Sequence, residues 1–168
     1  MIYFNGHKVL EDNDLQFQRN LLKNSANITV SKSNMSSASQ INNMFQLFTL
    51  SETVNKGDKI TISANVLSVV NGSGVNIGLW DTNITPYGDE NKSFSLGGRS
   101  HATFTVTKND SKAGIAIWAS NNGTNENSEA ILEKVMVQKG SVATMWLPAP
   151  EDLVTIEEFN QLKSKLGG

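Results

Sequence analysis

The stretch KITISANVL, residues 59–67, decides the fold class of this chain. Its apolar and polar residues alternate along the whole segment. In an extended chain they fall on opposite faces, Ile60, Ile62, Ala64 and Val66 on one and Thr61, Ser63 and Asn65 on the other. A period of two predicts a β-strand whose aliphatic face lies in a core and whose polar face meets solvent.

Five further segments show a similar short, strand-like pattern. They are MFQLFTL (44–50), VNIGLW (75–80), HATFTVT (101–107), AGIAIWAS (113–120) and AILEKVMVQ (130–138). The breaks between them are rich in Asn, Gly, Asp and Ser, which suit tight turns. No helical periodicity appears among these strands. The pattern therefore predicts an all-β protein, built as an antiparallel β-sandwich or barrel.

The composition of the 168-residue chain is that of a globular protein with a largely neutral surface, 38% hydrophobic and 18% charged. A formal net charge of −2, with scattered basic residues, predicts neither nucleic acid nor membrane as a partner. The chain has no cysteine, which excludes disulfides and thiolate metal sites. No segment approaches the length of a membrane span, and the start MIYFNGHKV lacks the pattern of a secretory signal.

Two segments of a different kind flank the predicted strands. The opening IYFNGHKV places short apolar segments around Asn5-Gly6, a pair favoured in two-residue hairpin turns. After Pro150, a capping box of Thr155 and Glu158 and a narrow apolar stripe predict a helix of about three turns. So short a helix must dock on the sandwich or pair with copies of itself. We expect a hairpin and connector over residues 1–19, a main domain over 20–150 and a helical segment over 151–168.

No combination of residues predicts catalysis. His7 and His101 lie far apart and in no metal-binding pattern, and a histidine on a strand surface is ordinarily solvated. A glycosidase needs two carboxylates that converge across a cleft, whereas Asp89 and Glu90 are adjacent and should diverge. We therefore expect no enzyme activity and no cofactor. Loop oxygens of Asp81, Asp89 or Glu90 could hold a structural calcium ion, although no regular Asp-x-Asp spacing marks such a site.

Two tryptophans depart from the alternation. Trp80 and Trp118 fall on the polar faces of their strands, where an indole serves ligand binding better than folding. A pyranose ring stacks its C–H face on an aromatic ring and offers its hydroxyls to amides and charged donors. The pattern predicts a saccharide site, with Trp80, Trp118, Tyr87, Arg99, His101, Asn76 and Asn65 as its residues. The alternative is that both indoles pack beneath a loop or against the N-terminal hairpin.

The end of the chain carries a more specific signature. After the last predicted strand it reads QKGSVATMWLPAPED, residues 138–152. With NLLKNS at 20–25 and the run of strands, this resembles a carbohydrate-binding-module-like jelly-roll domain of tail, baseplate and fibre proteins from phages of Gram-positive bacteria. The matching positions are Gln138-Lys139-Gly140, Ala143-Thr144, Trp146 and Pro148-Ala149-Pro150-Glu151-Asp152. Met145 and Leu147 depart from the pattern, and the resemblance covers residues 20–152.

The resemblance implies an antiparallel jelly-roll sandwich in a virion protein, made in the cytoplasm of the bacterial host. The implied function is non-catalytic adhesion to saccharides of the host cell wall or surface. Other virion proteins are the implied neighbours, and trimers are the common assembly, here through the C-terminal helix. In the motif Trp146 would plug the edge of the core, while Pro148 and Pro150 would hold an extended exit.

Two other functions fit the same residues. One is a structural decoration or spacer domain of the virion with no glycan ligand, in which Trp80 and Trp118 are covered by protein. The other is a carbohydrate-binding module of a bacterial glycosidase.

Overall fold

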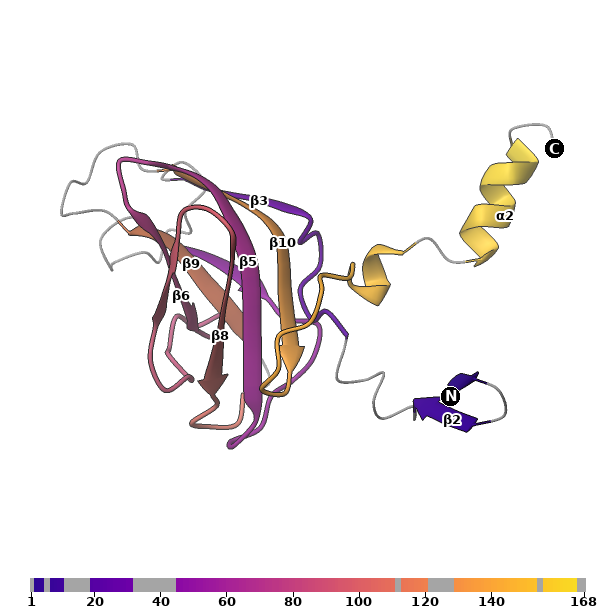
Figure 1. Ribbon diagram of the computed structural model, residues 1–168, viewed down its shortest axis with the longest axis horizontal. Coiled ribbons are helices and arrows are strands. Elements are labelled where there is room, and N and C mark those ends of the chain that lie inside the picture. Colours follow the sequence, from indigo (N-terminus) through magenta and orange to yellow (C-terminus); the bar gives the residue numbers. More distant parts are fainter. Residues whose placement is uncertain are drawn as a thin grey trace.

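The computed structural model describes residues 2–4, 7–10, 19–31, 45–110, 113–120, 129–153 and 156–165. Most of them belong to two antiparallel four-stranded sheets packed face to face (Figure 1). The first sheet has the order β3 (Asn27–Ser31), β10 (Glu129–Lys139), β5 (Lys59–Val70) and β8 (Arg99–Thr105). The second has the order β4 (Phe45–Thr49), β9 (Gly114–Ser120), β6 (Gly74–Leu79) and β7 (Lys92–Ser95). The chain is thus mostly antiparallel β structure, as the alternation predicted.

The strand pairing is nested. β6 pairs with β7, β5 with β8, β4 with β9 and β3 with β10, all antiparallel. The two halves of the chain therefore run together as one long hairpin, and successive pairs fall alternately in the second and the first sheet. Within each sheet a further pairing, β10 with β5 and β9 with β6, joins the two pairs.

The predicted aliphatic faces meet between the sheets and form the core. The buried residues of these faces are Ile60, Ile62, Ala64, Val66, Val75, Ile77, Leu79, Phe104, Val106, Ile115 and Ile117. Burial of each large aliphatic or aromatic side chain contributes about 1.5–3 kcal/mol. The assignment of these residues to the core is confirmed.

The outer face of the first sheet is less exposed than the alternation predicted. Thr61 and Ser63 point outward from β5, yet each is only 1% exposed. The guanidinium of Arg99, on neighbouring β8, donates to Ser63 Oγ at 2.6 Å, and Thr61 Oγ1 donates to the carbonyl oxygen of Gly140 at 2.7 Å. Alternation assigns a residue to a face, but it does not reveal what later crosses that face.

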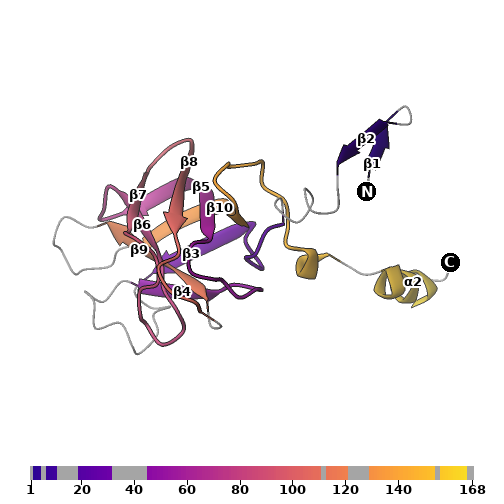
Figure 2. The same cartoon turned by 90° about the horizontal axis from the view of Figure 1, so that it is seen from below.

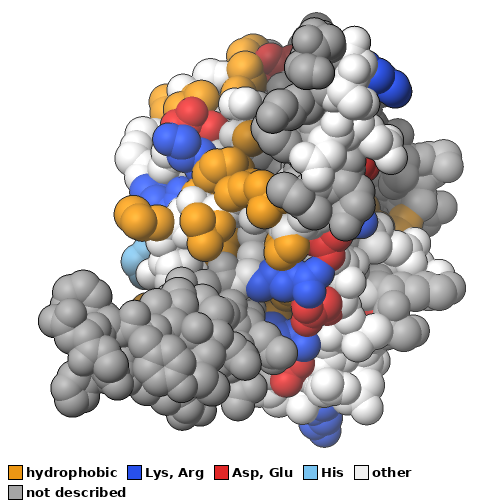
Figure 3. All heavy atoms as spheres, turned by 90° about the vertical axis from the view of Figure 1, so that its right-hand side faces the viewer, with side chains coloured by type: hydrophobic (Ala, Val, Ile, Leu, Met, Phe, Trp, Pro, Cys, Tyr) orange, Lys and Arg blue, Asp and Glu red, His pale blue; other side chains and the backbone are white. Residues whose placement is uncertain are grey.

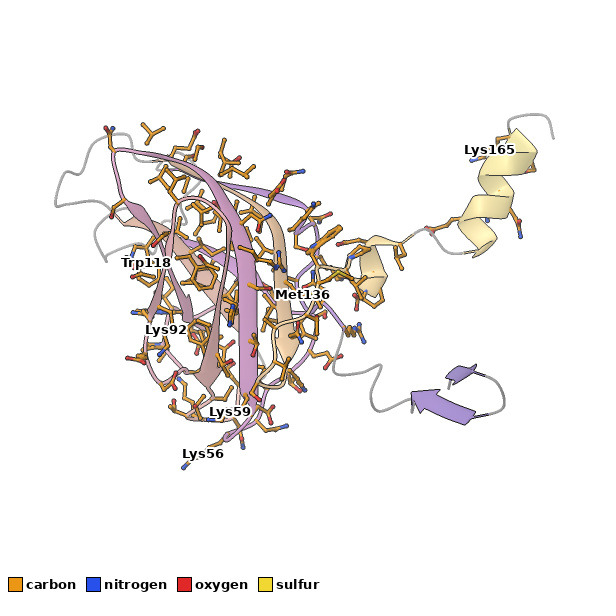
Figure 4. The ribbon with its side chains drawn as sticks, viewed as in Figure 1. Lys56, Lys59, Lys92, Trp118, Met136 and Lys165 are labelled. Carbon is orange, nitrogen blue, oxygen red and sulfur yellow. The ribbon has the colours of Figure 1, made fainter. Side chains whose placement is uncertain are left out.

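An irregularity in β10 sets the orientation of its second half. The register shifts between Glu133 and Met136, and Lys134 adopts a left-handed backbone with φ of 52°. Beyond this bulge Met136 pairs with Ser63 and faces outward, although it has no exposed surface. Figure 4 labels Met136 on the side of the sandwich where the chain leaves β10.

The segment after β10, residues 140–153, is called the exit segment here. Gln138 holds its first half, because its amide donates to the carbonyl oxygen of Val142 at 2.9 Å and its Oε1 accepts from Thr144 Oγ1 at 2.8 Å. Gln138 itself is 3% exposed. The outward side of β10 is therefore used to anchor the chain that follows it.

The second half of the exit segment is tied to the start of the domain. Trp146 Nε1 donates to Ser25 Oγ at 3.1 Å, and Ala149 is fully buried. The segment ends in a 3-10 turn, η2 (Pro150–Asp152). The structural role that the motif predicted for Trp146 is consistent with this hydrogen bond across 121 positions of sequence.

A hairpin and a helix lie outside the sandwich. β1 (Ile2–Phe4) and β2 (His7–Leu10) pair as an antiparallel hairpin, and α2 (Ile156–Lys165) follows the exit segment. Asn5-Gly6 of the predicted turn and Thr155 of the predicted capping box fall outside the described residues. Figures 1 and 2 show the hairpin and α2 on the same side of the sandwich, standing away from the sheets. No helix within the described part of the chain is long and apolar enough to cross a membrane.

Candidate functional site

The two tryptophans singled out by the sequence lie on the outer face of the second sheet. Trp118 of β9 lies opposite Asn76 of β6 and, on its other side, opposite Phe45 of β4. Trp80 follows β6 directly and forms an isolated bridge with Pro86. Trp118 is half-buried, and Figure 4 shows it on the side of the sandwich away from Met136.

The indole of Trp80 lies over Gly78 of its own strand. Its Nε1 donates to Asn91 Oδ1 at 3.2 Å, and the residue is only 9% exposed. Gly78 makes this position possible, because a Cβ there would come within 2.7 Å of Trp80 Nε1 and closer still to Asn91 Oδ1. Because residue 78 has no side chain, the Trp80 indole has room to pack against the strand at this position.

A small apolar cluster, called the outer cluster below, surrounds this indole. Trp80 and Ala116 form its buried part, and Leu47, Ile84 and Trp118 pack against them. Its buried residues are distinct from those of the core between the sheets, and Trp118 packs against both. Trp118 is therefore held in place by its packed neighbours. A ligand that stacks on its indole would lose little side-chain entropy on binding.

The loop after Trp80 supports one edge of the outer cluster. Asp81 Oδ1 accepts hydrogen bonds from the backbone N–H of Asn83 at 2.9 Å and of Thr85 at 2.8 Å. Ile84, between them, has a left-handed φ of 61°, which costs a β-branched residue about 1–2 kcal/mol. The capped loop and the packing of Ile84 on the outer cluster hold this strained conformation.

The polar surroundings of the outer cluster are neutral. Ser93 Oγ on β7 donates to Asn76 Oδ1 at 2.6 Å. Lys92 forms an ion pair with Glu90. Lys108 Nζ lies 3.8 Å from Asp81 Oδ2. The charged side chains near this face are therefore paired within the chain. The groups that a ligand could contact here are an amide, a hydroxyl and an indole.

Tyr87 was predicted as a ligand contact, and this prediction is wrong. Its side chain has no exposed surface, and its hydroxyl donates to the carbonyl oxygen of Gly114 at 2.7 Å. Burial raises the pKa of Tyr87 well above its ordinary value. The loop after Trp80 curls back so that Tyr87 N donates to the carbonyl oxygen of Leu79 at 3.0 Å, which turns the tyrosine into the core.

Three other predicted site residues lie on the first sheet. Asn65 of β5 and Arg99 of β8 are opposite each other in the register, and His101 lies next along the same face. Asn65 Nδ2 donates to Glu133 Oε1 at 3.0 Å, and Arg99 Nη1 donates to the carbonyl oxygen of Lys134 at 3.1 Å. His101 is exposed.

The seven predicted residues are therefore not one cluster. Trp80, Trp118 and Asn76 share the outer face of the second sheet, whereas Asn65, Arg99 and His101 share the outer face of the first. In a two-layer sandwich these faces point in opposite directions. Only the first group, with its two indoles, forms a candidate saccharide site.

Several residues of this site carry no clear signal in the sequence. Gly78 and Asn91 seat the Trp80 indole, while Leu47 and Ile84 pack beside it. Leu47 shares the alternation of its strand, and Gly78 is one of the 13 glycines of the chain. A glycine two residues before a tryptophan on the same strand face is the one pattern that could have indicated an indole packed against the strand.

Among the residues that the structure describes, no acidic or histidine-rich centre accompanies this face. Within the described ranges, no three His, Cys, Asp or Glu side chains are grouped so as to hold a metal ion. Of the three carboxylates considered for calcium, Asp81 caps its own loop, Asp89 Oδ1 accepts the backbone N–H of Glu90 at 3.0 Å, and Glu90 pairs with Lys92. Each of these carboxylates has a local structural partner.

Comparison with known proteins adds little beyond this geometry. No family model matches the chain, and no curated protein matches it. Among solved structures, a chain of the tripod from the baseplate of bacteriophage Tuc2009 is 15% identical, with a TM-score of 0.46 over 82% of this chain and 60% of that one. A CBM4 carbohydrate-binding module is 10% identical, with a TM-score of 0.44 over 67% of this chain and 94% of that one. The chain thus spans 60% of the length of the tripod chain, and both TM-scores lie below 0.5.

Proposed function

We propose that this chain is a non-catalytic adhesion module of a phage virion, which binds saccharides of the bacterial host surface through the outer face of the second sheet. The observation that carries the binding proposal is the half-buried Trp118, set beside Asn76 on the packed base of Trp80 and Ala116. The virion assignment rests on the motif of the exit segment and on its resemblance to phage tail, baseplate and fibre modules.

The chemistry of this face suits an uncharged ligand rich in hydroxyls. An indole face accepts the C–H face of a pyranose, and neighbouring amides and hydroxyls complete its hydrogen bonds. One such shallow contact binds weakly. Many copies on one particle would raise the overall affinity by roughly 10²–10⁴ without any new contact.

We also infer that the sandwich is a jelly roll. Support comes from the nested pairing, in which β3 joins β10, β4 joins β9, β5 joins β8 and β6 joins β7 across two four-stranded sheets. A hairpin rolled up in this way is the topology of double-sheet jelly rolls. On this proposal residues 20–150 are the domain, residues 1–19 precede it and residues 151–168 link it to other virion proteins or to copies of itself.

We propose further that α2 pairs with the same helix of other copies, in which case a trimer is the expected assembly. A ten-residue helix is marginal alone, and α2 stands away from the sandwich in Figure 1. Docking of α2 onto its own domain is the competing arrangement.

A structural spacer with no glycan ligand is the second candidate function. The observation in its favour is Trp80, which is 9% exposed and bonded to Asn91, so one of the two indoles is covered by protein. Trp118 distinguishes the two functions, because a binding module needs the exposed part of this indole for its ligand, whereas a spacer needs the indole only for packing.

The test is tryptophan fluorescence with acrylamide quenching during titration with cell-wall polysaccharides of Gram-positive hosts. We expect a saturable change in the wild type. Trp118→Ala, with folding intact by circular dichroism, should lose polysaccharide binding when binding is measured by calorimetry, which does not depend on the indole. His101→Ala, an exposed residue on the opposite face, is the matched control and should bind as the wild type does. No response to any of these glycans, with both indoles shielded from acrylamide, would count against the binding function and favour the spacer.

A further inference from the structure

Asn91 lies at the edge of the outer face of the second sheet, directly before β7. The residue is exposed, and its Oδ1 accepts the N–H of the Trp80 indole at 3.2 Å. A Cβ added at Gly78 would meet the same Oδ1, so the side chain of Asn91 reaches over β6. Asn91 therefore borders the outer cluster, to which Trp80 and Trp118 belong.

The indole fixes the direction in which the carboxamide of Asn91 is turned. An indole nitrogen donates a hydrogen bond and cannot accept one, so the atom that faces Trp80 Nε1 must be the oxygen. The two N–H groups of Asn91 Nδ2 are then turned away from the indole. Among the described residues they have no hydrogen-bond partner, so they are available to a ligand.

Asn76 of β6 repeats this arrangement beside Trp118, which it faces across the register. On its other side it lies opposite Ser93 of β7, whose hydroxyl donates to Asn76 Oδ1 at 2.6 Å. Its Nδ2 likewise has no partner in the part of the chain that the structure describes. Trp80 and Ser93 are thus positioning residues, which make two carboxamides present N–H groups rather than oxygens on this face.

The orientation of these amides selects the group that a ligand can place against them. A carbonyl oxygen only accepts hydrogen bonds, so it matches an amide that presents only N–H groups. A hydroxyl can accept as well, but its own proton finds both carboxamide oxygens occupied. An ammonium group brings only donors. The face therefore favours a ligand that presents carbonyl oxygens.

A carboxylate also only accepts, but its charge would need a cation, and the lysines near this face are paired. Lys92 forms its ion pair with Glu90, and Lys108 Nζ lies 3.8 Å from Asp81 Oδ2. Figure 3 faces the other side of the molecule, where Lys and Arg side chains lie beside Asp and Glu. The uncharged carbonyl of an amide is therefore the best match for the two carboxamides.

We propose that this face recognises an acetamido sugar. Its carbonyl oxygens accept hydrogen bonds from Nδ2 of Asn91 and of Asn76, and the C–H face of the sugar ring stacks on the Trp118 indole. The acetamido methyl groups add apolar surface that suits the outer cluster. Asn91 is thereby a further binding residue. The proposal rests on saccharide binding by this face and names the class of sugar.

Titration of the ¹⁵N-labelled chain with matched trisaccharides tests the class of sugar. Tri-N-acetylchitotriose carries acetamido groups, cellotriose has hydroxyls in their place and chitotriose has ammonium groups. We expect the acetylated trisaccharide to bind about tenfold more tightly than either of the others, because only its carbonyls match both amides. It should also shift the side-chain amide signals of Asn91 and Asn76. Equal affinity for cellotriose would contradict the assignment.

Asn91→Asp separates the amide donor from the contact with the indole. The aspartate keeps an oxygen for Trp80 Nε1 and removes both N–H groups, so binding of tri-N-acetylchitotriose should weaken about tenfold with the indole still shielded from acrylamide. Asn55→Asp is the matched control and should bind as the wild type does. It makes the same change of charge at an exposed position next to Lys56, which Figure 4 shows at the end of the sandwich away from Trp118.

Ser93 is tested by two substitutions that differ in the hydroxyl. Ser93→Ala frees the Asn76 amide to rotate and should weaken binding of tri-N-acetylchitotriose about threefold. Ser93→Thr keeps the hydroxyl and should bind as the wild type does. If both substitutions weaken binding equally, the hydroxyl of Ser93 does not position the amide.

The outcomes separate this proposal from saccharide binding itself. A cell-wall polysaccharide may be bound through Trp118 while tri-N-acetylchitotriose is not bound, or is bound no better by the wild type than by Asn91→Asp. In that case the face is a saccharide site, and the acetamido assignment is wrong. If the folded wild type binds neither polysaccharide nor trisaccharide, the adhesion function is wrong and the acetamido assignment falls with it.

Discussion

Asn20 holds the carbonyl oxygen of Leu147, 127 positions later in the chain, through a hydrogen bond of 2.9 Å from its Nδ2. The same amide nitrogen reaches Ser25 Oγ at 2.8 Å and the carbonyl oxygen of Val135 at 3.1 Å, so its two N–H groups serve three acceptors. One fully buried side chain thus joins the start of the domain, the last strand and the exit segment.

Substitution of Asn20 by Ala should lower the free energy of unfolding by about 3 kcal/mol or more. Besides the donors, the substitution removes Oδ1, which accepts the backbone N–H of Leu22 at 3.1 Å and of Val137 at 3.0 Å. Each buried group left without a partner costs about 1–3 kcal/mol. Urea unfolding measures the change, and exposed Asn83→Ala should cost less than ~0.5 kcal/mol. A loss at Asn20 no larger than that of the control would refute the role of this residue.

Gln138→Ala should release the first half of the exit segment without unfolding the sandwich. The substitution removes the amide that binds Val142 and the oxygen that binds Thr144. Trypsin cleaves after lysine, and Lys139 lies at the point where the exit segment begins. We expect the rate of cleavage after Lys139 to rise at least tenfold, as followed by mass spectrometry. Gln161→Ala, at an exposed position of α2, is the control, and an unchanged rate would show that other contacts hold the segment.

Much of the fold could be predicted from the sequence because alternation specifies faces. Ile60 and Ile62 could be assigned to the core without knowledge of any partner strand. The same rule failed for Thr61 and Ser63, whose outward face is covered by Arg99 and by the turn at Gly140. Whether another segment covers the outward face of a strand depends on the path of the chain in three dimensions. Local periodicity in the sequence does not encode that path.

The candidate site was less predictable for the same reason. Trp80 and Trp118 could be placed on polar strand faces, but alternation does not tell which sheet a strand joins. Asn65 and Arg99 were therefore grouped with the tryptophans, although the nested pairing places them on the opposite side of the sandwich. Tyr87 lies in a segment with the composition of a loop, and only the return of that loop to Leu79 buries it.

Gly78→Ala should displace the Trp80 indole. The new methyl group would fall within 2.7 Å of Trp80 Nε1 and 3.0 Å of its Cδ1, so the ring must leave its seat and its hydrogen bond to Asn91. We expect a loss of about 1–3 kcal/mol in unfolding free energy, a red shift of tryptophan emission and stronger acrylamide quenching. Asn91→Ala removes the hydrogen bond without the clash and should shift the emission less. If the spectrum of Gly78→Ala matches that of the wild type, the indole does not depend on the glycine.

Tyr87 should make the stability of the domain fall at high pH. Burial raises the pKa of its phenol above the ordinary value of 10.0, so the folded state holds the proton more tightly than the unfolded state does. The stabilisation is therefore complete below pH 10 and is lost as the pH rises beyond it. In a titration followed by ultraviolet absorbance, Tyr87 should ionise only above its ordinary pKa of 10.0, because burial raises that pKa. Tyr87→Phe should abolish this step and cost about 1 kcal/mol, because the hydrogen bond to Gly114 is lost. If the absorbance step that Tyr87→Phe removes lies at the ordinary pKa of a tyrosine, the buried position of Tyr87 is contradicted.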